Sequence, residues 1–188
     1  MSEQLENFTR TAIAAVLFFA IALSSGTAGA ASTEELDAHV RQSIEDLFRS
    51  SSAAKELSAK SVGMLVFPTV VKAGFLFGAE YGEGALQLGA TNLGYYNIVS
   101  ASYGLQAGVQ EKSVVLMFMT GDALNKFLQR KGWKVGVDGS VAIATLGVGE
   151  ELDTETLKKP IIGFEFSNRG LMANLTLEGS KISRVEKK

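Results

Sequence analysis

The chain has 188 residues, of which 46% are hydrophobic and 20% charged, which describes one globular domain with a real core and argues against disorder. Its formal net charge of −2 gives no overall reason to expect nucleic acid as a partner, because phosphate binding normally requires a strong basic excess. The lack of any cysteine excludes disulfides, thiolate metal sites and a lipid-modified cysteine anchor.

An apolar run near the N-terminus is typical of a signal peptide. Thr11–Leu23 is too short for a membrane-spanning helix of about twenty residues. It leads to Ala28-Gly29-Ala30, a small-residue pattern that predicts cleavage after Ala30. Glu3 and Glu6 outweigh Arg10 in the leading region, which is usually positive, so an uncleaved anchor stays as the alternative. We expect residues 1–30 to be a signal peptide and the protein to be exported, periplasmic or secreted, or peripheral on the outer or inner membrane.

Two helices are predicted next. Ser32 can cap the first one, and Glu35 can return the bond as a capping box. Apolar residues then recur at helical spacing on one stripe, which we expect to pack on a sheet: Leu36, Val40, Ile44, Leu47 and Phe48. A second, shorter helix is predicted over about Ala53–Ala59.

The stretch Val62–Gly84 reads as a buried apolar run, a corner at Pro68 and a second strand that ends in a glycine turn. In the strand expected over Val71–Tyr81, one face is apolar, whereas the other carries Gly74 and Gly78 between polar residues. Glycines inside a strand indicate sharp curvature or a closely approaching partner. Barrel curvature is the simpler interpretation, and a ligand groove is the alternative.

The rest of the chain predicts short strands and one helix. The helix spans Asp122–Arg130, is capped by Thr120 or Asp122 and stops at Gly132. Ser113–Met119 lacks alternation and should be a central strand covered on both sides. The other predicted strands are 85–90, 94–103, 105–109, 133–137, 140–146, 161–167, 171–177 and 181–185, with a surface loop at 150–155. Close spacing and few crossover helices favour antiparallel pairing, so the fold class is α+β, with N-terminal helices packed on a curved, mainly antiparallel sheet or partly closed barrel.

Few residues support catalysis. His39 is the only histidine, so a catalytic triad or a multi-histidine metal site would have to be built around it alone. Glu80 and Glu83 flank the expected glycine turn, where solvated carboxylates are the simpler interpretation. With Glu165 or Asp138 they could form a pair for glycoside hydrolysis, which stays as a remote alternative. We expect no enzymatic activity, metal or cofactor, and the chain has no nucleotide-binding glycine motif.

Several ordered motifs resemble the SYLF-domain family of lipid-binding proteins. They are Gly63-x-Leu65-Val66-Phe67-Pro68, Lys72-Ala73-Gly74-Phe75, Tyr81-Gly82-x-Gly84, the stretch 102–110, Gly132-Trp133-Lys134-Val135-Gly136, and Gly170-Leu171 through Leu177-Glu178-Gly179. The resemblance spans roughly Thr33 to Arg184. It implies lipid association, and it implies that lysines near the first motif, Lys55, Lys60 and Lys72, engage acidic headgroups. A solvated surface position is the alternative for each of them. Actin and phosphoinositides are associated with the eukaryotic branch, whereas a signal-bearing chain looks like the bacterial one.

One local group of residues suggests a membrane contact. Four cations and the only tryptophan lie within nine positions: Lys126, Arg130, Lys131, Trp133 and Lys134. Basic residues are attracted to anionic leaflets, and tryptophan favours the headgroup interface. The alternative is structural, since cations commonly end helices and Trp133 could start a strand in the core.

These observations predict a single SYLF-like domain over residues 31–188. Its function is expected to be non-enzymatic binding of a phospholipid or other anionic lipid headgroup at a membrane surface of the bacterial cell envelope. An envelope structural or protein-interaction module that uses exposed strand edges is the alternative. We expect no nucleic acid partner.

Overall fold

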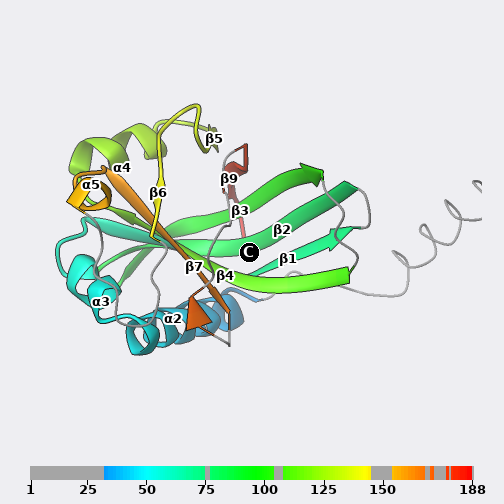
Figure 1. Ribbon diagram of the computed structural model, residues 1–188, viewed down its shortest axis with the longest axis horizontal. Coiled ribbons are helices and arrows are strands. Elements are labelled where there is room, and N and C mark those ends of the chain that lie inside the picture. Colours follow the sequence, from blue (N-terminus) through cyan, green and yellow to red (C-terminus); the bar gives the residue numbers. More distant parts are fainter. Residues whose placement is uncertain are drawn as a thin grey trace, which may run out of the picture. The chain divides into compact units, whose positions relative to one another are not determined.

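The N-terminal helices cover one face of a bent, mainly antiparallel sheet in the computed structural model (Figure 1). The structure describes residues 32–74, 77–103, 108–144, 154–167, 170–171, 177 and 179–187, all of which belong to one unit that begins at Ser32. The predicted signal peptide and the predicted strand over 171–177, apart from its two end residues, lie outside the described residues.

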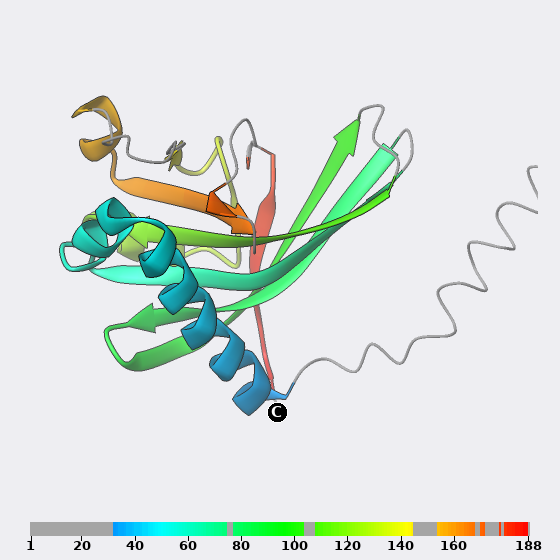
Figure 2. The same ribbon diagram turned by 60° about the horizontal axis from the view of Figure 1, so that its bottom comes forward.

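The first described element is α2, Thr33–Ser50, and it is followed by α3, Ser52–Ser58. The predicted cap is confirmed, because the Ser32 hydroxyl accepts a hydrogen bond of 3.2 Å from the backbone N–H of Glu35. The predicted apolar stripe faces the sheet, with Leu36, Val40 and Leu47 buried. Figure 2 shows α2 crossing the strands. No described helix has the length and apolar character needed to cross a bilayer.

A nine-stranded sheet carries most of the chain. Its strands lie in the order β5-β9-β3-β2-β1-β4-β7-β6, with β8 paired to β7, and among them only β6 and β7 pair in parallel. The bounds are β1 Gly63–Gly74, β2 Phe77–Leu88, β3 Thr91–Tyr103, β4 Gly108–Phe118, β5 Gly132–Lys134, β6 Ala142–Ile143, β7 Ile161–Ser167, β8 Gly170–Leu171 and β9 Lys181–Val185. The predicted α+β class is therefore confirmed.

The sheet has two covered faces, which we name by their relation to α2. The outer face packs against α2 through side chains such as Val66 and Ala85. The inner face holds the main core, to which α4, Gly121–Leu128, contributes Leu124 and Phe127. Residues 114–118 of β4 are fully buried, which confirms the prediction of a central strand covered on both sides.

The expected corner at Pro68 is a β-bulge within one long strand. From Val66 to Thr69, β1 advances three residues while β2 advances two, and β4 shows the same mismatch. Proline tolerates this position because a bulge interrupts the ladder to which its missing N–H would donate. Pro68 therefore bends β1 without ending it.

The predicted strand over Val71–Tyr81 is wrong, because the chain reverses there between β1 and β2. The hairpin pairs Gly74 with Gly78, so strand parity is kept across the turn and Val71 faces the same side as Tyr81. Local alternation could not reveal the reversal for that reason. The predicted glycine turn is also wrong, since Gly82 and Gly84 lie inside β2.

The glycines of β2 instead mark a close approach between strands. A Cβ on Gly84 would lie 2.1 Å from the carbonyl oxygen of Val66, and one on Gly82 would lie 2.7 Å from that of Thr69. Both contacts are with backbone at the bulge, where the strands are pressed together. Close packing explains these two glycines without a ligand.

Beyond α2, strands β1 to β4 extend into an arm, seen at the upper right of Figure 2. We define its described residues as 71–74, 77–81, 99–103 and 108–111. The short helix α5, Thr154–Leu157, replaces the last part of the predicted 150–155 loop.

Candidate functional site

A pair of lysines lies side by side on the outer face at one end of the sheet. Strand β5 alternates, so Trp133 points into the core while Lys134 points outward. Lys134 is the direct cross-strand partner of Lys181 on β9, and both side chains are exposed. We call Lys134 and Lys181 the lysine pair.

The two charges of the lysine pair are not neutralised by the described residues. Asp138 is the nearest described acid in sequence, but its Oδ1 atom accepts a 2.7 Å bond from Arg130 and its Oδ2 atom accepts one of 2.7 Å from the backbone N–H of Lys134. Neither ammonium group forms an ion pair with a described carboxylate. Like charges directly opposite in a sheet are unfavourable, so the pair lowers the stability of the folded state.

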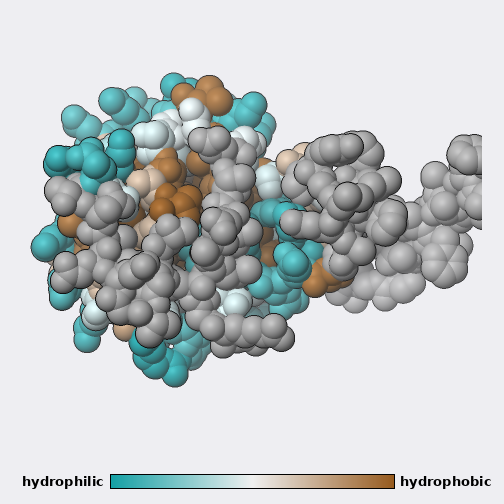
Figure 3. Space-filling model, in the orientation of Figure 1, coloured by the Kyte–Doolittle hydropathy of each residue, from teal (hydrophilic) through white to brown (hydrophobic). Residues whose placement is uncertain are grey.

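The basic group expected between positions 126 and 134 is only partly on the surface. Lys126 and Lys131 are exposed, and Figure 3 shows hydrophilic side chains over α4. Arg130 is exposed but bound to Asp138. Trp133 is only 2% exposed and lies in the core, so its interpretation as an interfacial aromatic is corrected in favour of the core alternative.

The lysines implied by the SYLF resemblance do not form one cluster. Lys55 and Lys60 are exposed on and just after α3, which packs on the outer side with α2. Lys72 lies on the inner face of β1, where its ammonium is 3.5 Å from Glu80. The structure therefore places Lys72 in a buried ion-pair network rather than beside Lys55 and Lys60.

That network is a line of alternating charges across four strands, β1, β2, β4 and β7. Lys112 Nζ lies 3.0 Å from Glu80 and 3.4 Å from Glu165, and Glu80 also contacts Lys72. Burial raises the pKa of Glu165 despite the attraction of Lys112, and its Oε1 atom has no described hydrogen-bond partner. The expectation of Glu80 as a solvated turn carboxylate is therefore wrong.

The outer face of the arm is apolar and partly exposed. Lys181 pairs across the sheet with Val99, which pairs with Tyr81, which in turn pairs with Val71. Since direct cross-strand partners point to the same face, the lysine pair continues into these side chains. The next row outward, also exposed, consists of Ala101, Ala79, Ala73 and Val109. We call the seven apolar residues of these two rows the apolar arm face.

Polar contacts hold the base of the arm. Glu83 accepts hydrogen bonds from the Lys187 ammonium at 2.5 Å and from the Tyr81 hydroxyl at 2.9 Å. Burial opposes ionisation of Glu83, but these two bonds outweigh it and lower its pKa. Burial and the Glu83 contact raise the pKa of Tyr81, so its hydroxyl remains protonated and polar.

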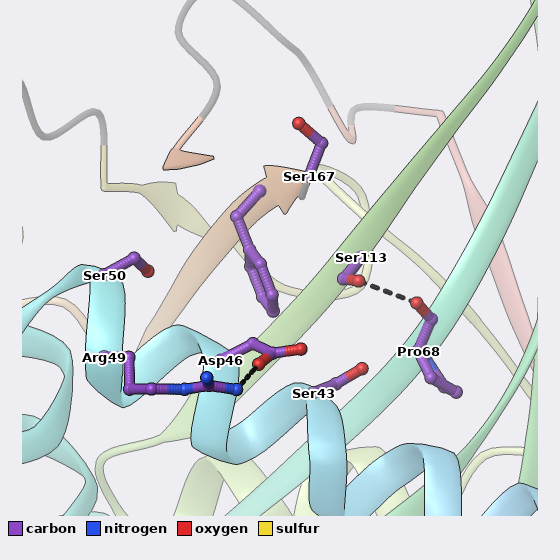
Figure 4. A pocket seen from close by; sticks show the side chains of 8 residues that line it. Ser43, Asp46, Arg49, Ser50, Pro68, Ser113 and Ser167 are labelled. Atoms are coloured by element: carbon purple, nitrogen blue, oxygen red, sulfur yellow. Dashed lines mark hydrogen bonds and ion pairs between the residues drawn. The ribbon is translucent and has the colours of Figure 1, made fainter. Parts of the chain in front are cut away.

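A polar pocket of about 490 Å³ opens between α2 and the outer face (Figure 4). The bulge helps to form it, because the carbonyl of Pro68 leaves the ladder and accepts a 2.7 Å bond from the Ser113 hydroxyl. Its lining residues are Ser43, Asp46, Arg49, Ser50, Pro68, Ser113, Phe166 and Ser167.

The charges in this pocket cancel. Arg49 donates to the carboxylate of Asp46 one turn away on α2, as the dashed line in Figure 4 marks. A lone anion there would meet Asp46, and a lone cation would meet Arg49. The described residues also contain no group of three or more acids, histidines or cysteines that could hold a metal ion. The pocket can therefore offer hydroxyl contacts but no strong attraction for one charge sign.

Sequence reasoning missed two parts of this surface. Lys181 lies 47 positions beyond Lys134, and only the β5–β9 register brings them together. The apolar arm face was hidden by the unrecognised hairpin, although the parity of Val71 and Tyr81 pointed to a shared face.

Residues 99–188 of the chain match the family model described as Ysc84, Las17-binding protein actin regulator. The matched segment contains Lys126, Lys131 and the lysine pair, and it begins at Val99 of the apolar arm face. No curated protein matches the chain.

Proposed function

We propose, on the premise that the Ysc84 match over residues 99–188 and the SYLF-like motifs mark one and the same family, that the chain is a non-enzymatic lipid-binding protein of the bacterial cell envelope. The ligand is an anionic membrane surface. The family description names Las17 binding and actin regulation, but an exported chain would not meet cytoskeletal partners. The lysine pair is the observation that supports the proposal.

The electrostatics favour an anionic partner. A lysine near an anionic leaflet contributes roughly 1 kcal/mol to binding. Lys134 and Lys181 also repel each other in the free protein, and a phosphate between them would relieve that repulsion. Exposed Lys126 and Lys131 extend the positive potential toward α4. Several weak attractions of this kind give reversible attachment without a lipid anchor.

Liposome flotation tests the proposal. Purified protein should float with phosphatidylcholine vesicles that contain phosphatidylglycerol, and flotation should increase with the anionic fraction. Added salt should weaken it, because the Debye length falls to roughly 8 Å at 0.15 M ionic strength. Flotation that is absent, or equal on neutral and anionic vesicles, would contradict the proposal.

A matched pair of variants assigns the effect to the lysine pair. Lys134→Gln/Lys181→Gln should reduce flotation on anionic vesicles several-fold. Lys158→Gln/Lys159→Gln makes the same change in net charge at exposed lysines beyond α5 and should retain more binding. If the two variants behave alike, net charge rather than this surface governs binding.

Lys55→Gln/Lys60→Gln tests the surface implied by the family resemblance. Both lysines are exposed near α3, so this variant should fold like the wild type. A larger loss of flotation than that of the lysine-pair variant would move the proposed contact to α3.

The alternative, a protein-interaction module that uses strand edges, has less support. The described path of the sheet ends in β5, of three residues, and β6, of two. Short edge strands offer few backbone groups for strand addition. Such a module would also show no dependence on anionic lipid.

Export is part of the proposal and has its own test. The small residues Ala28 and Ala30 support cleavage before Ala31. N-terminal sequencing of protein from a bacterial host should therefore begin at Ala31. Finding Met1 on membrane-extracted protein would support an uncleaved anchor instead.

A further inference from the structure

The apolar arm face and the lysine pair form one continuous surface. Val99 is the direct cross-strand partner of Lys181, so an exposed apolar side chain lies beside a cation that no described carboxylate neutralises. Tyr81 and Val71 continue the same row toward Glu111 on β4. The row therefore passes from the basic lysine pair through apolar side chains to the exposed Glu111.

Three of the larger side chains of this apolar surface are strongly exposed. Val109 is 69% exposed, Tyr81 50% and Val99 45%. The small residues Ala73, Ala79 and Ala101 lie between them and are also exposed, so the face is shallow. Contiguous exposed apolar residues with a polar border are typical of an interaction surface.

Helix α2 does not cover this face. Helix α2 instead contacts the sheet near the start of β3, far from the arm. There Asp37 accepts hydrogen bonds of 2.9 Å from Asn92 and 3.2 Å from Tyr95. The hydrogen-bonded side chains of Glu83 and Lys187 lie between Tyr95 and Tyr81 on the outer face. Figure 3 shows hydrophobic side chains near the outer end of β4, where the arm projects.

We propose that the apolar arm face enters the boundary between headgroups and acyl chains of an anionic bilayer, while Lys134 and Lys181 hold the phosphates beside it. This inference rests on the proposed function and adds the apolar contact to it. Tyr81 suits that depth, because its ring is apolar and its hydroxyl remains polar on Glu83. The adjoining lysine pair favours an anionic bilayer over a neutral apolar partner.

A single fluorescent probe tests insertion directly. The chain has no cysteine, so Val109→Cys provides one attachment site for an environment-sensitive dye. With anionic vesicles, its emission should shift to the blue and should be quenched by lipids that carry a nitroxide just below the headgroup. The same dye on Leu157→Cys, an exposed apolar position on α5, should show neither change.

Substitutions separate the apolar contact from the ionic one. Val99→Ser/Val109→Ser should weaken vesicle binding about tenfold at every salt concentration, leaving the slope of affinity against salt unchanged. Lys134→Gln/Lys181→Gln should flatten that slope. Val62→Ser/Leu157→Ser removes comparable exposed apolar surface elsewhere and should bind like the wild type. Thermal melts confirm that each variant is folded.

The outcomes distinguish this inference from the function on which it rests. If the wild type binds no vesicle, both fail. If binding depends on anionic lipid and on the lysine pair, but the Val109 probe stays in water and Val99→Ser/Val109→Ser binds normally, the insertion alone is overturned. If light scattering shows a dimer that Val99→Ser/Val109→Ser dissociates, the face belongs to a second copy and the insertion is likewise overturned.

Discussion

Trp133 meets Phe127 edge-on in the core, with ring centroids 5.7 Å apart and ring planes at 73°. Phe127 also contacts Phe118 with centroids 5.1 Å apart, so this aromatic group joins α4 and β5 to the centre of the sheet. Trp133→Ala should lower the free energy of unfolding by about 3 to 5 kcal/mol, because it empties a buried site. Denaturant melts measure this, with exposed Lys131→Ala as the control. A near-neutral Trp133→Ala would contradict the core assignment.

The lysine pair should be less stable than an oppositely charged pair. Lys134→Glu replaces a repulsive cross-strand contact with an attractive one to Lys181, so it should raise the free energy of unfolding by about 0.5 kcal/mol. The same variant should bind anionic vesicles more weakly. Lys131→Glu, which has no such partner in the β5–β9 register, should reduce binding without the gain in stability. Denaturant melts should show the gain in stability, and flotation should show the weaker binding. A loss of stability in Lys134→Glu would contradict the prediction.

Gly84 should tolerate no side chain. Its Cβ would lie 2.1 Å from the backbone oxygen of Val66, which can move only if the bulge moves. We expect Gly84→Ala to lower the free energy of unfolding by at least about 2 kcal/mol. Gly121→Ala is the control, since nothing lies within 4 Å of that Cβ and the residue begins α4, where alanine should be neutral or favourable. Equal melts for the two variants would contradict the close approach.

Glu165 should make stability depend on pH. Because burial raises its pKa above the ordinary value of 4.5, the folded state holds this proton more tightly than the unfolded state does. The contribution of the bound proton to the free energy of unfolding is therefore complete below about pH 4.5. It is lost as the pH rises through the raised pKa. Glu165→Gln cannot titrate, so its stability relative to wild type should increase with pH over that window. Denaturant melts from pH 4 to 9 test this, and parallel curves for the two proteins would refute it.

The elements with a repeated local pattern were predictable. The Ser32 cap and the stripe through Leu47 predicted α2, and the apolar run of β4 predicted a central strand. The β1–β2 hairpin was not predictable in this way, because pairing Gly74 with Gly78 preserves the alternation that one straight strand would have. Alternation of apolar and polar residues is the same whichever way a strand runs, so it does not show where the chain reverses.

The candidate site was predictable only where it is local in sequence. Lys126, Lys131 and Lys134 are close in the chain and are indeed exposed. The inward direction of Trp133 depends on strand parity at β5, which a three-residue strand is too short to reveal. Lys181 is brought in by strand register, a long-range property that no local window contains.

The bulge at Pro68 makes the facing of the arm insensitive to the loss of one codon within it. Val66 and Val71 both face outward, although five positions separate them, because β1 has one extra residue at the bulge. Deleting that residue would restore one-to-one pairing, so Val71 would stay opposite Tyr81 and Lys72 would stay opposite Glu80. A descendant gene with this deletion would therefore keep both the apolar face and the inner ion pair, and it would lose the bulged carbonyl that accepts the bond from Ser113.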